Sequence, residues 1–153
     1  MERTTSFRDL HVWQQSMALT TRVYELSRSF PEDEKFGLTA QIRRASVSVP
    51  SNIAEGSGRR SKGEFLQFLG IATGSLREVE TETILATMLG FVEEVQETLE
   101  SISRISMMLT RLRQSVEARG SGVREPSAVY SAGPEDVSHD LQWLQENGVA
   151  VEF

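Results

Sequence analysis

Apolar residues recur at helical spacing over the first three-quarters of the chain, which predicts four successive helices. The first spans about residues 9–30, where two adjacent apolar stripes make a wide core-facing surface. Ser6 and Asp9 have the spacing of a capping box at its start, and Pro31 ends it. The stripes consist of Leu10, Trp13, Met17 and Tyr24, and of Val12, Leu19, Val23, Leu26 and Phe30.

The second predicted helix follows an acidic turn at residues 32–34 and ends at Gly56 and Gly58. Pro50 lies inside it and removes one backbone donor, so we expect a kink or break at residues 46–49. Nearby serines are expected to bond the carbonyls that the proline frees. The core positions are Leu38, Ile42, Ala45, Val49 and Ile53.

The third predicted helix opens at Ser61 and Glu64, which have the spacing of a capping box. Small residues, including Gly70 and Gly74, are unusually frequent along it. Because glycine inside a helix costs about 1 kcal/mol relative to alanine, we expect another backbone to approach this seam closely. Two seven-residue repeats define its core side: Phe65, Ala72, Val79 and Ala86, and Leu69, Leu76, Thr83 and Gly90.

The fourth helix is predicted over residues 92–118, and short connections imply that consecutive helices are antiparallel. The pattern therefore predicts an all-α fold, an antiparallel up-down four-helix bundle followed by a flexible C-terminal tail. Its inward residues are Val95, Leu99, Ile102, Leu109, Leu112 and Val116.

The composition changes after residue 118, which divides the chain into a bundle domain (1–118), a flexible linker (119–134) and a tail (135–153). The tail predicts a short amphipathic helix and an alternating, strand-like end. Because so short a segment cannot bury its apolar face, we expect it to dock on its own subunit, a neighbouring subunit or a separate protein. Its docking residues are Val137, Leu141, Trp143, Leu144, Val149, Val151 and Phe153.

The charge distribution is asymmetric, although the net charge is only −6. Residues 1–77 carry 11 Lys+Arg against 8 Asp+Glu (+3), and residues 78–153 carry 5 against 14 (−9). Such asymmetry indicates either a solvated acidic face or head-to-tail self-association. The absence of cysteine, of a signal-peptide pattern and of a long apolar run favours a cytoplasmic protein with no membrane span.

Residues with catalytic or metal-binding potential are few. The chain has two histidines, and the glutamates of the third and fourth helices have the spacing of solvated helix exteriors. Asp136 and His139 give only one lone carboxylate–histidine pair, whereas a di-iron bundle needs two such pairs and two further glutamates. We therefore expect no metal, no cofactor and no enzymatic activity.

Five basic residues are the candidate nucleic-acid-binding site: Arg43, Arg44, Arg59, Arg60 and Lys62. The last three precede a helix N-terminus, whose free amides also favour anions. The glycine-rich stretch 56–63 lacks the order of a nucleotide-binding loop, and no strand precedes it. For Arg43 and Arg44, pairing with glutamates of a neighbouring helix or subunit, RNA or DNA phosphate contact, and structural burial all remain open.

Several blocks of this chain resemble the bacterial four-helix-bundle proteins known as 23S ribosomal RNA intervening-sequence proteins. The resemblance covers about residues 7–91, and the fourth helix continues it more loosely. The blocks are Leu10-His-Val-Trp13, Tyr24-Glu-Leu-Ser27, Gly37-Leu-Thr-Ala-Gln-Ile-Arg-Arg44, Ser51-Asn-Ile-Ala-Glu-Gly56, Glu64-Phe-Leu-Gln-Phe-Leu69 and Gly74-Ser-Leu-Arg-Glu78.

The resemblance implies a ring-like homopentamer that acts as a non-enzymatic scaffold or RNA-associated factor. A distant relative is the accessory protein of diversity-generating retroelements, a pentamer that binds nucleic acid and a reverse transcriptase. An accessory role for such a nucleic-acid enzyme is therefore the alternative hypothesis. The isoelectric point near 5.0 and the segment 119–153 depart from that pattern.

Overall fold

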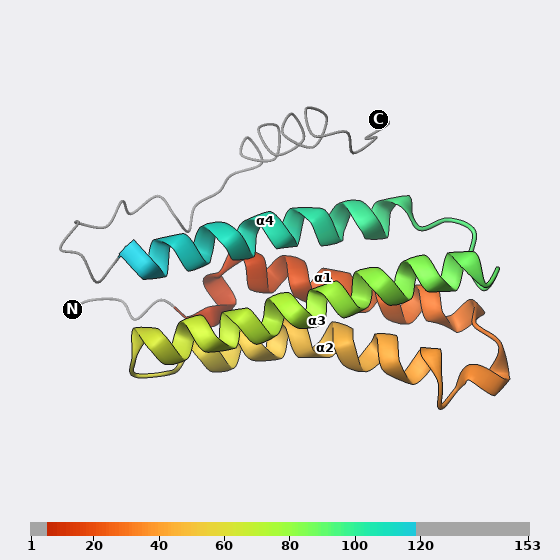
Figure 1. Cartoon of the computed structure of the whole chain (residues 1–153), viewed down its shortest axis with the longest axis horizontal. Helices are drawn as coiled ribbons and strands as arrows, with labels where there is room; N and C mark the ends of the chain where they lie inside the picture. The colour runs from red at the N-terminus through yellow and green to blue at the C-terminus, as the bar shows by residue number, and fades with distance from the viewer. Residues whose placement is uncertain (1–5, 119–153) are drawn as a thin grey trace.

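The computed structural model describes residues 6–118 and shows four antiparallel helices around one core (Figure 1). The α1–α2 and α3–α4 connections lie at one end of the bundle, and the α2–α3 connection lies at the other (Figure 1). This confirms the predicted all-α four-helix bundle, while the predicted linker and tail lie outside the described residues. The helices are α1 (His11–Leu26), α2 (Leu38–Ser57), α3 (Lys62–Met88) and α4 (Gln96–Ala118); 3₁₀ turns occupy Phe7–Asp9, Ser27–Ser29 and Glu32–Glu34.

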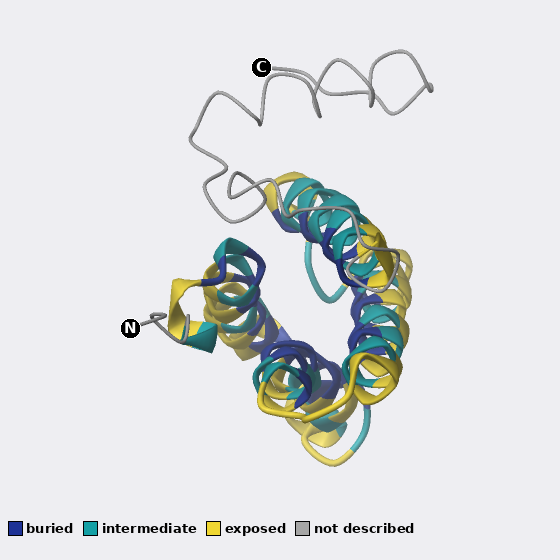
Figure 2. Cartoon of the chain, turned by 90° about the vertical axis from the view of Figure 1, so that its left-hand side faces the viewer, coloured by how far each residue is buried: buried dark blue, intermediate teal, exposed yellow. Residues whose placement is uncertain are grey.

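The core lies where the four helices face one another, and the view along the bundle shows their buried sides turned inward (Figure 2). The apolar series predicted for α2 is buried from Leu38 to Ile53, as expected. Each large aliphatic side chain buried in this way stabilises the fold by about 1.5–3 kcal/mol. The fully buried Leu and Ile residues are Leu19, Ile42, Ile53, Leu69, Leu76, Ile102, Ile105 and Leu109.

The buried face of α1 is narrower than the sequence predicted. The capping box of Ser6 and Asp9 is present, but it starts the 3₁₀ turn before α1. Met17 and Tyr24, predicted to face the core, are 44% and 41% exposed. Ser16, the residue before Met17, is buried instead, and its hydroxyl donates to the Val12 carbonyl at 2.6 Å. One stripe therefore faces the core, and the other lies at its margin.

Helix α2 continues through Pro50, so the predicted break at residues 46–49 is wrong. Proline has no N–H to donate to the carbonyl four residues earlier, which is that of Ser46. Thr20 of α1 offers the missing donor, because its hydroxyl lies 2.9 Å from the Ser46 carbonyl oxygen and shares its one hydrogen with the Ser16 carbonyl of its own helix, at 3.0 Å. A neighbouring helix, and not a nearby serine, compensates for this carbonyl.

Helices α2 and α3 approach each other closely at Gly56, where an added Cβ would be 2.6 Å from the Phe68 Cβ. The sequence placed a close approach at Gly70 and Gly74 instead. A Cβ at Gly74 would meet no described atom within 4 Å, and one at Gly70 would meet only the Arg113 guanidinium, at 3.9 Å. Within the described chain, neither glycine is needed for helix packing.

None of the described helices is long and apolar enough to cross a lipid bilayer.

Candidate nucleic-acid interface

The two ends of the bundle differ in charge. The α2–α3 connection and the start of α3 carry Arg59, Arg60 and Lys62, which we call the basic end. The two connections at the opposite end are acidic (Figure 1). They contain Glu32, Asp33, Glu34, Glu93 and Glu94.

Local sequence fixes the turn at the basic end. Helix α2 stops at Ser57, and the N–H of Gly58 donates to the Glu55 carbonyl at 3.2 Å. Ser61 then caps α3, as predicted, by accepting a hydrogen bond from the Glu64 N–H at 3.2 Å. The basic residues therefore lie at a helix N-terminus, where unpaired amides and the helix dipole favour an anion.

The three basic side chains differ in how they are held. The Arg59 guanidinium pairs with Glu55 at 2.6 Å and stacks over the Phe68 ring at 4.7 Å. The Lys62 Nζ donates to the Glu117 carbonyl at 3.1 Å, which places the last turn of α4 beside the basic end. Arg60 is exposed and makes no ion pair within residues 6–118. All three remain exposed to solvent.

Arg43 lies away from the basic end and faces α1. Its Nε donates to the Ser27 hydroxyl at 2.8 Å, and its guanidinium lies 4.7 Å from the centre of the Tyr24 ring. About 21 Å of helix separates Arg43 from Ser57 at the end of α2. This side chain ties α2 to α1.

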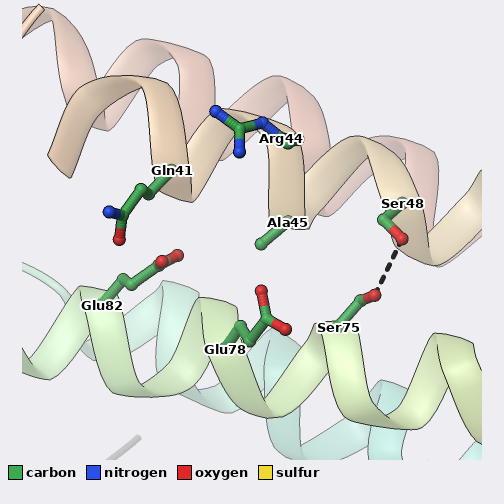
Figure 3. A pocket seen from close by; sticks show the side chains of 7 residues that line it. All are labelled: Gln41, Arg44, Ala45, Ser48, Ser75, Glu78 and Glu82. Carbon is green, nitrogen blue, oxygen red and sulfur yellow. Dashed lines mark hydrogen bonds between the residues drawn. The ribbon is translucent and has the colours of Figure 1, made fainter. Parts of the chain in front are cut away.

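Arg44 faces α3 across a polar cavity of about 290 Å³ (Figure 3). The Ser48 and Ser75 hydroxyls are hydrogen-bonded across this cavity at 2.8 Å. Arg44 and the two cavity glutamates, Glu78 and Glu82, lie on opposite walls without an ion pair between them (Figure 3). The predicted pairing of Arg44 with glutamates is therefore not seen as an ion pair within residues 6–118, although the Arg44 charge lowers the pKa of Glu82.

Glu82 has the most perturbed environment in the cavity. The pKa of its carboxyl is raised to about 7, mainly by burial and to a lesser degree by the charge of Glu78, while the charge of Arg44 opposes the shift. Its Oε2 is buried without a hydrogen-bond partner in the described structure. The sequence placed Glu82 on a solvated face, and its only signal was the spacing of one helical turn from Glu78. No cluster of three acidic, histidine or cysteine residues that could hold a metal occurs in residues 6–118.

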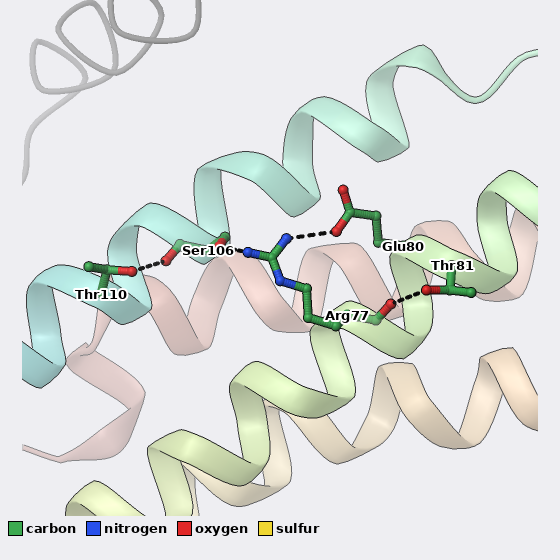
Figure 4. A network of polar contacts seen from close by, with 5 residues as sticks. All are labelled: Arg77, Glu80, Thr81, Ser106 and Thr110. Carbon is green, nitrogen blue, oxygen red and sulfur yellow. Dashed lines mark hydrogen bonds and ion pairs between the residues drawn. The ribbon is translucent and has the colours of Figure 1, made fainter. Parts of the chain in front are cut away.

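Arg77 belongs to a different network, which joins α3 to α4 (Figure 4). Its guanidinium donates to Glu80 at 2.8 Å and to the Ser106 hydroxyl at 3.5 Å. The Thr110 hydroxyl donates to the Ser106 carbonyl at 3.0 Å on the α4 side. Arg77 therefore holds two helices together and does not extend the basic end.

These observations define a small helical protein, a four-helix bundle with a basic end and an acidic end. The chain belongs to the 23S rRNA-intervening sequence protein family, whose model matches residues 8–111. This confirms the resemblance found in the sequence. A comparison with curated proteins gives no match. Residues 119–153 lie outside the family match.

Proposed function

We propose that this protein is a homo-oligomeric, non-enzymatic factor that binds RNA phosphates at its basic end. The observation that carries the proposal is the set of three exposed cations at the N-terminus of α3. The guanidinium of Arg59 is held by Glu55 and Phe68, so little side-chain freedom would be lost on binding. The family name refers to 23S rRNA, which makes RNA the first probe to test.

Arg43 and Arg44 have a different role in this proposal. Arg43 bonds Ser27 and stacks on Tyr24, whereas Arg44 faces the glutamates of α3. Arg43 is partly buried and Arg44 is exposed, but both side chains face neighbouring helices of their own chain, so we assign these two residues to stability. Phosphate contact then rests on Arg59, Arg60 and Lys62.

Assembly of several chains would let a weak phosphate-binding site hold RNA. The family resemblance implies a pentamer, and a ring of five chains would present five basic ends to one RNA strand. Simultaneous contacts raise the overall affinity without any new contact in each site. This multiplication offsets the unfavourable net charge of −6 per chain.

The test is a salt titration of binding to a single-stranded RNA, comparing the wild type with an Arg59→Glu/Arg60→Glu variant. Each lost phosphate contact lowers the slope of log K against log salt by about 0.7, so the double variant should lose about 1.4 per chain. The matched control, Arg28→Glu/Lys35→Glu, makes the same charge change at the acidic end. This control should retain the wild-type slope.

Two results would contradict the proposal: no binding by the wild type at low salt, or equal weakening by both double variants. Equal weakening would mean that RNA responds to net charge and not to the basic end. Variants of Arg43 should instead lower the free energy of unfolding and leave the salt slope unchanged.

A further inference from the structure

The chain leaves the bundle beside the basic end. The bond from the Lys62 Nζ to the Glu117 carbonyl, at 3.1 Å, joins the start of α3 to the last turn of α4. Ala118 is the final residue of α4. The 35 residues that follow, 119–153, therefore begin within a few ångströms of Lys62, one of the three cations that the proposed function assigns to RNA.

These residues end in a strongly acidic segment. Residues 135–153 contain no lysine or arginine and five acidic side chains: Glu135, Asp136, Asp140, Glu146 and Glu152. Sixteen residues, 119–134, separate Ala118 from Glu135; fully extended, this connection spans about 56 Å. As a coil they would span about 23 Å, so the acidic segment can return to the basic end.

We propose that the acidic segment 135–153 docks on the basic end of its own chain and must be displaced before RNA binds. Carboxylates and phosphates make the same charge-assisted hydrogen bonds with arginine, so the segment occupies the positions that phosphates would take. The opposite end of the bundle carries Glu32, Asp33, Glu34, Glu93 and Glu94, which repel the segment. The regulatory part of this inference rests on the proposed function, whereas the docking itself does not.

Because the acidic segment is attached to the same chain, weak ion pairs are sufficient to hold it on the basic end. For a connection of this length that behaves as a random coil, the effective concentration is in the millimolar range. Individual exposed ion pairs contribute little, but a tethered segment with five carboxylates competes with a multivalent ligand at low salt. We expect docking to lower the affinity for RNA about three- to tenfold, and this effect to disappear at high salt.

Docking can be observed without RNA, because Trp143 lies in the acidic segment and Trp13 is the other tryptophan of the chain. In a full-length Trp13→Phe variant, Trp143 should have high anisotropy and low quenching by neutral acrylamide at low salt. The Arg59→Glu/Arg60→Glu change, or high salt, should release it. The control Arg28→Glu/Lys35→Glu should leave it docked.

A dye on Asn147→Cys, in a chain without other cysteines, provides the same readout with Trp13 intact. If Trp143 and the dye are equally mobile in the wild type and the Arg59→Glu/Arg60→Glu variant, docking on the basic end is overturned. A mixing experiment tests whether the segment docks on its own chain or on a second copy. The Arg59→Glu/Arg60→Glu chain, which keeps its acidic segment, is mixed with a chain that keeps its basic end but has a neutralised segment 135–153. Docking restored in that mixture would assign the segment to a second copy and overturn docking within one chain.

The competition is tested by neutralising the segment with Glu135→Gln, Asp136→Asn, Asp140→Asn, Glu146→Gln and Glu152→Gln in the full chain. This variant should bind RNA about three- to tenfold more tightly at low salt. Unchanged RNA affinity would overturn the competition. Docking of Trp143 together with no RNA binding by any variant would reject the proposed function and support the docking.

Discussion

At the scale of single residues, Gly56 is a position where α2 packs too closely on α3 to leave room for a side chain. A methyl group there would lie 2.6 Å from the Phe68 Cβ and 3.0 Å from the Phe65 Cδ2. We expect Gly56→Ala to lower the free energy of unfolding by about 1–3 kcal/mol, because overpacking outweighs the gain in helix propensity.

Gly63→Ala is the matched control, because a Cβ at Gly63 meets no described atom within 4 Å. Its effect should be neutral or stabilising by up to about 1 kcal/mol. Urea unfolding followed by circular dichroism measures both variants. Equal stability of the two variants would show that the α2–α3 contact can relax around a methyl group.

Glu82 should make stability depend on pH. Its folded-state pKa of about 7 lies above its ordinary value of 4.5. The folded chain therefore holds this proton more tightly than the unfolded chain, and the stability that this gives is lost as pH rises from about 4.5 to about 7. Glu82→Gln, which stays neutral, should raise the free energy of unfolding by about 1 kcal/mol at about pH 8, allowing for solvent screening.

The same substitution should have little effect at about pH 5, where Glu82 is already protonated in the folded chain. Unfolding of the wild type and the variant at both pH values gives the difference directly. Glu93→Gln, in the exposed α3–α4 connection, is the control and should show no such change. A stability difference for Glu82→Gln that is the same at both pH values would mean that the carboxyl is fully solvated.

At the scale of helices, α2 passes through Pro50 because α1 supplies a donor. Thr20→Val removes the hydroxyl that lies 2.9 Å from the Ser46 carbonyl and leaves a buried acceptor unpaired. We expect a loss of about 1–3 kcal/mol in the free energy of unfolding. Thr21→Val is the control, because the exposed Thr21 hydroxyl donates only to Met17 in its own helix.

The pairing of Thr20 with Pro50 can be isolated by a double-mutant cycle. Pro50→Ala restores a backbone N–H that can donate to the Ser46 carbonyl. In that background Thr20→Val should cost clearly less, giving a coupling energy of about 1 kcal/mol. Additive effects of the two substitutions would show that Thr20 does not compensate for the proline.

The sequence predicted the helices and most of their inward faces because periodicity is a local property. The series from Leu38 to Ile53 depends only on residues along one helix, and it is buried as predicted. The exposure of Tyr24, the donor at Thr20 and the close contact at Gly56 depend on which helix lies opposite, and periodicity does not contain that information.

In the candidate site, too, some features follow from the local sequence and others depend on tertiary contacts. Ser61 marks the start of α3, so the position of Arg59, Arg60 and Lys62 at a helix N-terminus could be read from the sequence. Arg43 and Arg44 are adjacent in sequence but face α1 and α3, respectively. Their separation from the basic end follows from tertiary contacts, as does the environment of Glu82.

At the scale of the molecule, the up-down topology gives the bundle two unlike ends. It places the α1–α2 and α3–α4 connections together, so two acidic stretches about sixty residues apart in sequence share one end (Figure 1). The basic connection lies alone at the other end. An approaching polyanion is therefore oriented toward the start of α3 before any specific contact forms.

The outward side of α3 carries a concentration of exposed apolar side chains. Five of the nine large hydrophobic side chains exposed in residues 6–118 lie on α3 or at its C-cap. A helix with apolar side chains on both its inner and outer sides is typical of one covered on both sides. These five are Ile71, Ile84, Leu85, Met88 and Leu89.

Gly74 allows this interface to be tested separately from the fold. Gly74 is exposed and a Cβ there would meet no described atom of its own chain within 4 Å, so we expect Gly74→Leu to leave the packing within the bundle unchanged. If a second chain packs closely there, the leucine should weaken the contact by about 1–3 kcal/mol. Light scattering should then show a pentamer for the wild type and smaller species for the variant, with unchanged helix content.

Gly63→Leu is the control, because Gly63 is equally open in the chain but lies at the start of α3. It should assemble like the wild type. A wild type that is monomeric at micromolar concentration would reject assembly altogether. A Gly74→Leu variant that assembles as well as the control would place the interface elsewhere, since only a neighbouring chain can sense a leucine at that position.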